Sequence, residues 1–215
     1  GHSDQITSPD DDSHSEENKF NLNHLEFGPV RYPKGIIDAL MSHSIPLETL
    51  KFVDSSFDEE SANSLISFLR GTTTLKYLDI SNCSFKDIQL EAIITSFISN
   101  TAVNEVSLIL NKLKIHGKRY AMVMQALTQY SDKIVELSLN ENGLSQAEPL
   151  FIDLGQFKNL KRLSLALNFN KKMQGIGNSL IQLLGYWEDA LVEIDSKLLS
   201  QPNDQSLLEN KMYCL

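Results

Sequence analysis

The sequence contains few of the residues on which several classes of protein depend. Its 215 residues include two cysteines, Cys83 and Cys214, which excludes the disulfide framework of small secreted domains and favours a cytoplasmic location. Lysine and arginine total 19 against 28 aspartates and glutamates, whereas binding to nucleic acid requires clustered cations. A run of about 18 apolar residues, which a helix needs to cross a bilayer, is missing. We therefore expect no nucleic-acid partner and no membrane span.

Common motifs of catalysis and cofactor binding are also missing. The chain has no Gly-x-Ser-x-Gly, GxxxxGK[ST], His-Glu-x-x-His or Cys-x-x-Cys. The stretch GIGNS at 175–179 lacks the third glycine of a dinucleotide-binding loop, and the five histidines are scattered. These absences predict a protein that is not an enzyme and that has no cofactor and no metal.

The first 18 residues are polar and acidic, with almost no large apolar side chains. Such a segment cannot offset the entropy lost on ordering, so we expect residues 1–18 to be a disordered acidic tail. Gly1 and His2 stand where an initiator methionine would be, which is typical of a tag remnant. We therefore expect the chain to be part of a longer protein, with possible continuation into further repeats or domains.

One spacing of apolar residues recurs along the rest of the chain, and it fits neither a helix nor a simple strand. It reads apolar-x-x-apolar-x-apolar-x-x-(small or Asn)-x-apolar. The copies begin at Leu47, Leu75, Val103, Ile134 and Leu160, and a degenerate copy begins at Leu22. Successive full copies are 28, 28, 31 and 26 residues apart. These periods are in and just beyond the range of leucine-rich repeats.

With these residues, the chain resembles leucine-rich-repeat proteins, and its helical second halves are similar to the ribonuclease-inhibitor-like subfamily. The resemblance covers residues 20–197. It implies an α/β solenoid, a horseshoe arc with short parallel β-strands on the concave face and α-helices on the convex face. Residues 19–46 would form an N-terminal cap or degenerate repeat, 47–190 the repeats, and 191–215 a C-terminal cap and helix.

Each predicted strand ends in a sharp turn that leaves backbone groups unpaired. A side chain that both donates and accepts hydrogen bonds can satisfy them, and each bond is worth about 1 kcal/mol. In the alignment above, this structural ladder consists of Ser55, Cys83, Asn111, Asn142 and Asn168. We expect Cys83 to be buried in this ladder and therefore unreactive. Asp58 and Asp87 are the expected N-caps of the two helices that follow the first two turns.

The strand residues that point away from the core would form an extended docking surface. We predict that a partner protein binds there, on Tyr77, Asp79, Glu105, Ser107, Ile109, Glu136, Asn140 and Arg162. Ile109, Leu110 and Leu167 are apolar where water is expected. Either they form an exposed patch with a charged rim, or Leu110 and Leu167 turn into the adjoining loop and only Ile109 is exposed.

Two other groups have both a functional and a structural interpretation. His116 and Gly117 lie in the repeat with extra residues, which is either a contact loop or a solvated insertion with Tyr120 packed on the helix. Glu59 and Glu60 are adjacent carboxylates, but in a first helical turn they favour the helix dipole rather than acid–base chemistry.

Together these features predict a non-catalytic protein–protein interaction module of a larger intracellular protein. Two alternatives come from the resemblance. Ran GTPase-activating proteins have similar repeats, which would make the chain a catalytic accessory. Tropomodulins have about five such repeats followed by a helix, and "TTTLKYLDIS" at 72–81 is similar to their strand-opening sequence, which would imply actin capping. The partner's identity is not determined by the sequence.

Overall fold

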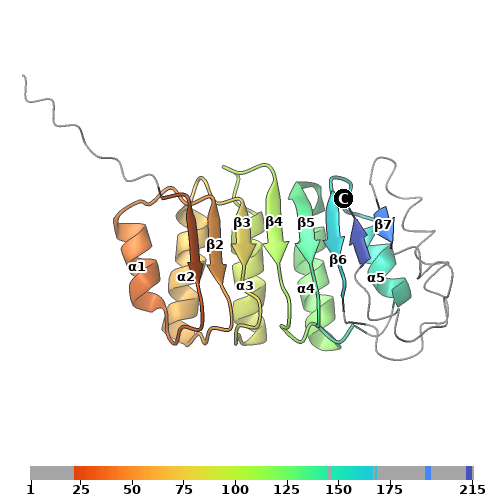
Figure 1. The fold of residues 1–215 in the computed structure, drawn as a ribbon, viewed down its shortest axis with the longest axis horizontal. Coiled ribbons are helices and arrows are strands. Elements are labelled where there is room, and N and C mark those ends of the chain that lie inside the picture. The colour runs from red at the N-terminus through yellow and green to blue at the C-terminus, as the bar shows by residue number, and fades with distance from the viewer. Residues whose placement is uncertain (1–21, 145–146, 167, 169–191, 195–211, 215) are drawn as a thin grey trace, which may run out of the picture.

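The computed structural model describes residues 22–144, 147–166, 168, 192–194 and 212–214. Its centre is one open sheet whose strands follow the order β1-β2-β3-β4-β5-β6-β8-β7. The parallel strands are β1 (His24–Phe27), β2 (Thr49–Phe52), β3 (Tyr77–Asp79), β4 (Val106–Ile109), β5 (Ile134–Ser138) and β6 (Arg162–Ser164). They lie side by side in the order of the chain (Figure 1).

A helix follows each of the first five strands. These are α1 (Lys34–Ser42), α2 (Glu59–Gly71), α3 (Asp87–Ile98), α4 (Lys118–Thr128) and α5 (Ala147–Leu154), with a 3-10 turn at Ser131–Lys133. All five helices lie behind the sheet in Figure 1, and no described helix covers its front. The predicted α/β class and the alternation of parallel strands with helices are confirmed, and the arrangement is compatible with a solenoid arc.

The core lies between the sheet and the helices. Leu50, Leu78, Leu108, Leu137 and Leu163 are buried and occupy matching positions in neighbouring strands. The helices contribute a second row of buried apolar side chains that includes Ile37, Leu65, Ile93, Val123 and Leu150. Because each inner strand shares its core with the strands on both sides, no unit buries its apolar face alone.

The register of β4 differs from the predicted alignment by two residues. Leu108, not Val106, pairs with Leu78, and Val106 pairs with Ile134. The prediction that Leu78 and Val106 are equivalent is therefore wrong. In this register Leu113 occupies the position of Cys83, and an irregularity between Val106 and Ser107 places Val106 beside Ile134. Leu113 fits the consensus less well than Asn111 does, so the sequence pattern alone favoured the wrong register.

The turns after β2, β3, β4 and β5 share a residue with a left-handed backbone. The four equivalent residues are Asp54, Asn82, Lys112 and Glu141, with φ between 53° and 56°, and all four are exposed. Their amides donate to carbonyl oxygens of the next unit, as from Asp54 to Ser81 and from Asn82 to Asn111. The left-handed residue therefore turns each strand toward the helix side while it keeps the backbone paired.

Helix starts follow the sequence with one exception. Asp58 caps α2, because its side chain accepts a hydrogen bond from Ser61 N at 2.8 Å. In α3 the N-cap is Lys86, and Asp87 is the first helical residue, so the predicted cap is one residue off. Gln89 Oε1 accepts a hydrogen bond from Lys86 N at 2.9 Å.

At the far end of the stack the sheet changes direction. β8 (Met212–Cys214) pairs antiparallel with β6, and β7 (Val192–Ile194) pairs antiparallel with β8. Residues 212–214 are thus a strand and not part of the helix expected at the C-terminus. At the other end, β1 and α1 lie in the segment expected to be the N-terminal cap. The predicted tail at 1–18 lies outside the described residues.

Candidate functional site

The open face of the sheet carries rows of side chains at strand spacing. One row joins His24, Thr49, Tyr77, Ser107, Glu136 and Arg162, and the next joins Glu26, Lys51, Asp79, Ile109, Ser138 and Ser164. Of the predicted binding residues, Tyr77, Asp79, Ser107 and Glu136 are half-buried and neighbouring on this face. We call the face of β2–β5 around Tyr77 and Asp79 the sheet-face site.

Asp79 is the centre of this site. Its Oδ1 accepts a hydrogen bond from Ser81 N at 2.9 Å, and it forms no ion pair with any residue that the structure describes. Burial raises the pKa of Asp79, and the hydrogen bond from Ser81 and the positive charge of Lys51 on the neighbouring strand only partly oppose this effect. A half-buried carboxylate without a direct ion pair costs stability. Such a group on an open face is a candidate for binding a cation from outside.

The residues around Asp79 are already paired with one another. Lys51 Nζ lies 3.0 Å from a Glu26 oxygen and 5.7 Å from the centroid of the Tyr77 ring. Arg162 lies 3.3 Å from Glu136. Burial raises the pKa of the Tyr77 hydroxyl to about 12, so it stays a hydrogen-bond donor at neutral pH. The site therefore combines a carboxylate that has no direct ion pair with an aromatic ring held under Lys51.

The predicted apolar patch is not present. Ile109 has 7% and Leu110 has 0% of its surface exposed, and Leu167 lies outside the described residues. Both earlier interpretations required Ile109 to be exposed, so both are wrong on this point. Glu105 also lies elsewhere than predicted, before the start of β4, where it pairs with Lys161 at 3.2 Å.

The predicted ladder divides into two rows of hydrogen bonds. In the buried row, Asn142 Oδ1 accepts from Leu113 N at 2.8 Å and its Nδ2 donates to Leu110 O at 2.7 Å. Asn168 makes the equivalent bonds to Asn142 N and Leu139 O, both at 2.7 Å. The same row contains Ser55, which bonds to backbone atoms of Gly28 and Val30, and Cys83, which donates to Phe52 O.

Asn111 belongs to the other row, nearer the open face. Its Oδ1 accepts from Ser138 Oγ at 2.7 Å and from Asn140 N at 2.8 Å. Asn140 repeats this pattern with Ser164 Oγ and Ala166 N. The placement of Asn111 beside Asn142 in one ladder is thus corrected, and Leu113 fills the buried position. Because Asn140 is used in this way, its side chain is partly committed to structure.

Neither of the other singled-out groups forms a reactive centre. His116 is exposed and lies against Gly143, its Cδ2 3.5 Å from where a Cβ would stand. Tyr120 of α4 donates to Asp153 of α5 at 2.7 Å. Glu59 and Glu60 lie in the first turn of α2. Within the described ranges, no three His, Cys, Asp or Glu residues gather in a way that could hold a metal ion.

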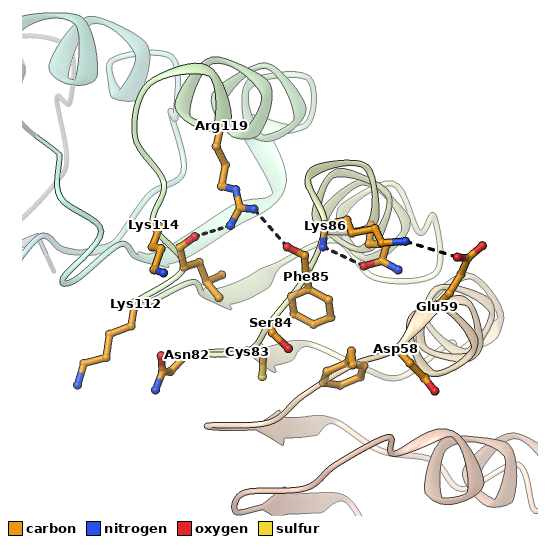
Figure 2. A pocket seen from close by; sticks show the side chains of 13 residues that line it. Asp58, Glu59, Asn82, Cys83, Ser84, Phe85, Lys86, Lys112, Lys114 and Arg119 are labelled. Carbon is orange, nitrogen blue, oxygen red and sulfur yellow. Dashed lines mark hydrogen bonds and ion pairs between the residues drawn. The ribbon is translucent and has the colours of Figure 1, made fainter.

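A pocket that the sequence did not reveal lies where β2, β3 and β4 end and α2, α3 and α4 begin. We call it the strand-end pocket; its volume is about 480 Å³. It is lined by Phe57, Asp58, Glu59, Asn82, Cys83, Ser84, Phe85, Lys86, Gln89, Lys112, Leu113, Lys114 and Arg119 (Figure 2). The cluster of cations in "KLKIHGKR" at 112–119 was the one sequence feature that could have indicated this pocket. The pocket itself forms only because stacking places these residues and Lys86, which belongs to the preceding unit, around one cavity.

Comparisons with known proteins bear on the fold. No protein-family profile matches the chain. Over 126 residues, 58% of the chain, the sequence is 27% identical to "Capping protein, Arp2/3 and myosin-I linker protein 2" of Mus musculus. The chain spans about a tenth of that protein's length, since the match covers 10% of it. Among the described residues, no helix is long and apolar enough to cross a membrane. The match and the sheet of parallel strands fit a leucine-rich-repeat type of fold.

Proposed function

We propose that the chain is a non-catalytic protein-interaction module, a leucine-rich-repeat solenoid of the ribonuclease-inhibitor-like type within a longer protein. Its partner is a protein that binds the sheet-face site. The strand-to-strand spacings of 28, 30, 29 and 26 residues between Leu50, Leu78, Leu108, Leu137 and Leu163 support the repeat type. The distant likeness to a linker protein supports the interaction role.

One observation carries the choice of surface: Asp79 is half-buried on an open face, its pKa is raised by burial, and it forms no direct ion pair with any described residue. A lysine or arginine of the partner would supply a direct ion pair, and an arginine could also stack on Tyr77. The ion pairs of Lys51 with Glu26 and of Arg162 with Glu136 would surround this contact. Buried charge pairs inside an interface affect affinity much more than charges at its rim.

The test is affinity capture from a cell extract with the full chain and with Asp79→Asn, read by quantitative mass spectrometry. Asn can still accept the bond from Ser81 N, so this change removes the charge and preserves the local geometry. The matched control is Glu91→Gln, the same charge change on the exposed surface of α3. Proteins lost with Asp79→Asn but retained with Glu91→Gln support the proposal, and identical recoveries refute the sheet-face site.

A second candidate function is specific to the cytoskeleton. The name of the mouse relative describes that protein as a linker of capping protein, Arp2/3 and myosin-I, and the resemblance to tropomodulins also implies an actin-related role. Binding of the chain to purified capping protein, Arp2/3 complex and myosin-I tests the first role, and actin pointed-end elongation tests the second. The catalytic-accessory alternative predicts faster GTP hydrolysis by Ran in the presence of the chain.

A further inference from the structure

The strand-end pocket shares no lining residue with the sheet-face site, and the proposed function does not depend on it. We infer that it binds an acidic peptide segment of a partner protein. An apolar side chain of the peptide packs on the Phe57 and Phe85 side of the pocket, and the peptide's carboxylates pair with the surrounding cations. The inference depends on three properties of the pocket: its charge, its apolar wall and the placement of its cations.

The charge of the pocket is opposite to that of the chain. Four cations line it, Lys86, Lys112, Lys114 and Arg119, against the two carboxylates of Asp58 and Glu59, whereas the chain has a formal net charge of −9. Three of these cations also pair with carboxylates: Lys86 with Glu59, Lys112 with Glu141 and Arg119 with Asp87. Lys114 is exposed and forms no ion pair with any residue in the described part of the chain. Lys114 is therefore the cation that is free for an acidic ligand, and the exposed pairs of Lys86 and Lys112 can exchange their carboxylates for those of the ligand.

The pocket is preorganised by Arg119 at the start of α4. Its guanidinium donates to Leu113 O at 2.7 Å and to Phe85 O at 3.2 Å, and its Nε lies 2.7 Å from Asp87 Oδ1. Figure 2 shows this side chain directed toward the loop that ends in Phe85. These bonds connect the loop after β3 with the loop after β4. Arg119 and the two loops are therefore held in place before a ligand binds, which reduces the entropy cost of binding.

Aromatic rings form the apolar wall. The centroids of Phe57 and Phe85 are 4.7 Å apart, and Phe52 lies edge-on to Phe57 at 5.4 Å. Leu113 and Cys83 also line this part of the pocket. Such a wall offers nothing to a bare anion, but it can accept an aromatic or aliphatic side chain.

The cations lie apart from one another, which favours a chain of charges over a single phosphate. Lys86 reaches toward Glu59, 3.5 Å away, while Lys112 extends from the opposite side of the pocket (Figure 2). A phosphate site needs donors that converge on one point. The start of α2 instead carries Asp58 and Glu59, and Asp58 already accepts from Ser61 N. A peptide with several carboxylates can meet the separated cations at the same time.

The test is a titration of the isotope-labelled full chain, followed through its amide NMR signals. The probe is the peptide Glu-Glu-Phe-Glu-Glu, and its uncharged match is Gln-Gln-Phe-Gln-Gln. We expect the acidic peptide to shift the signals of residues 82–86 and 112–119, with binding that weakens as salt is added. No shift at these residues, or equal shifts with the uncharged peptide, would overturn the proposal.

Charge reversal provides the second measurement. Lys114→Glu should weaken binding of the acidic peptide by about fivefold or more, since it replaces an attraction with a repulsion. The control is Lys76→Glu. Lys76 is an exposed lysine that pairs with Glu48 just before β3 begins, at the opposite end of this strand from the pocket. This change should alter binding by less than about twofold. Unchanged signals elsewhere in the spectrum show that each variant is folded. Equal effects of the two variants contradict the assignment of the pocket.

Two further experiments test whether a different ligand binds in the strand-end pocket. If inorganic phosphate shifts the same signals more strongly than the peptide does, the pocket is an anion site and the proposal is wrong. The chain's own acidic segment is examined with a triple variant of the full chain, Asp10→Asn, Asp11→Asn and Asp12→Asn. Shifts at residues 82–86 and 112–119 caused by these changes alone, without peptide, would show that this segment occupies the pocket and would also overturn the proposal.

Discussion

At the scale of single residues, polar groups of the buried turns decide how well one unit holds the next. Asn142 is 1% exposed and bonds to three backbone groups of the preceding unit, on Leu110, Leu113 and Ile115. Ser55 and Cys83 make fewer and weaker bonds at the equivalent positions. The contacts between units are therefore better bonded near Asn142 than near Cys83.

Replacement of Asn142 by alanine should lower the free energy of unfolding by about 3 kcal/mol, because it leaves buried amides and a carbonyl without partners. Urea denaturation measures this loss. The control is Asn104→Ala at an exposed position, where we expect a change below about 0.5 kcal/mol. Comparable losses in both variants would show that the ladder does not contribute as described.

Cys83 makes stability depend on pH. Burial raises its pKa from 9.0 to about 12, so above pH 9 the unfolded chain loses a proton that the folded chain keeps. Stability therefore falls as pH rises through this range, by about 1.4 kcal/mol between neutral pH and pH 10. A Cys83→Ala variant lacks this contribution, while Tyr77 and other groups act equally in both proteins. Urea denaturation of both proteins at pH 8 and pH 10 should show a smaller decline in the variant; equal declines would contradict it.

At the scale of elements, helix ends and strand spacing were predicted better than register. The helices were predictable from their apolar periodicity, and the N-cap role of Asp58 was predictable from its place just before α2. The register of β4 could not be predicted, because Val106, Leu108 and Leu110 alternate and satisfy the pattern in two ways. In the incorrect register of β4, Asn111 falls at the ladder position, which made that register fit the pattern better.

The end of α1 contains an avoidable strain. The amide of Ser44 donates to Met41 O and that of Ile45 to Leu40 O, which is the Schellman arrangement. Ser44 has φ of 48° at the position that glycine usually occupies. Ser44→Gly should raise the free energy of unfolding by about 0.5–1 kcal/mol, measured by urea denaturation. Ser44→Ala keeps the Cβ and should give no gain; a gain from alanine would contradict the role of the left-handed backbone.

At the scale of the whole molecule, stability comes from stacking, so position along the stack matters. Leu78 in β3 is fully buried between Leu50 and Leu108, whereas Leu25 in β1 is only partly buried at the end of the described row. The strand-end pocket also exists only at this scale, since its lining comes from three consecutive units. The sequence of a single repeat therefore does not indicate the strand-end pocket.

Leu78→Ala should cost about 3 kcal/mol or more of unfolding free energy, because the cavity is enclosed by neighbours on both sides. Leu25→Ala should cost about 1 kcal/mol, because that site is partly open to water. Urea denaturation of both variants gives the comparison. Similar costs at the two sites would mean that the units contribute independently of their neighbours.

The row of left-handed turn residues has a practical consequence. Asp54, Asn82, Lys112 and Glu141 are exposed, and none of them is glycine, so backbone geometry tolerates an acid, an amide and a base at the same position. Their strands are spaced at about 4.8 Å. These turns thus present side chains of different charge at a regular interval along one edge of the stack. Single substitutions at these four positions can therefore change the charge of that edge while the turn keeps its backbone conformation.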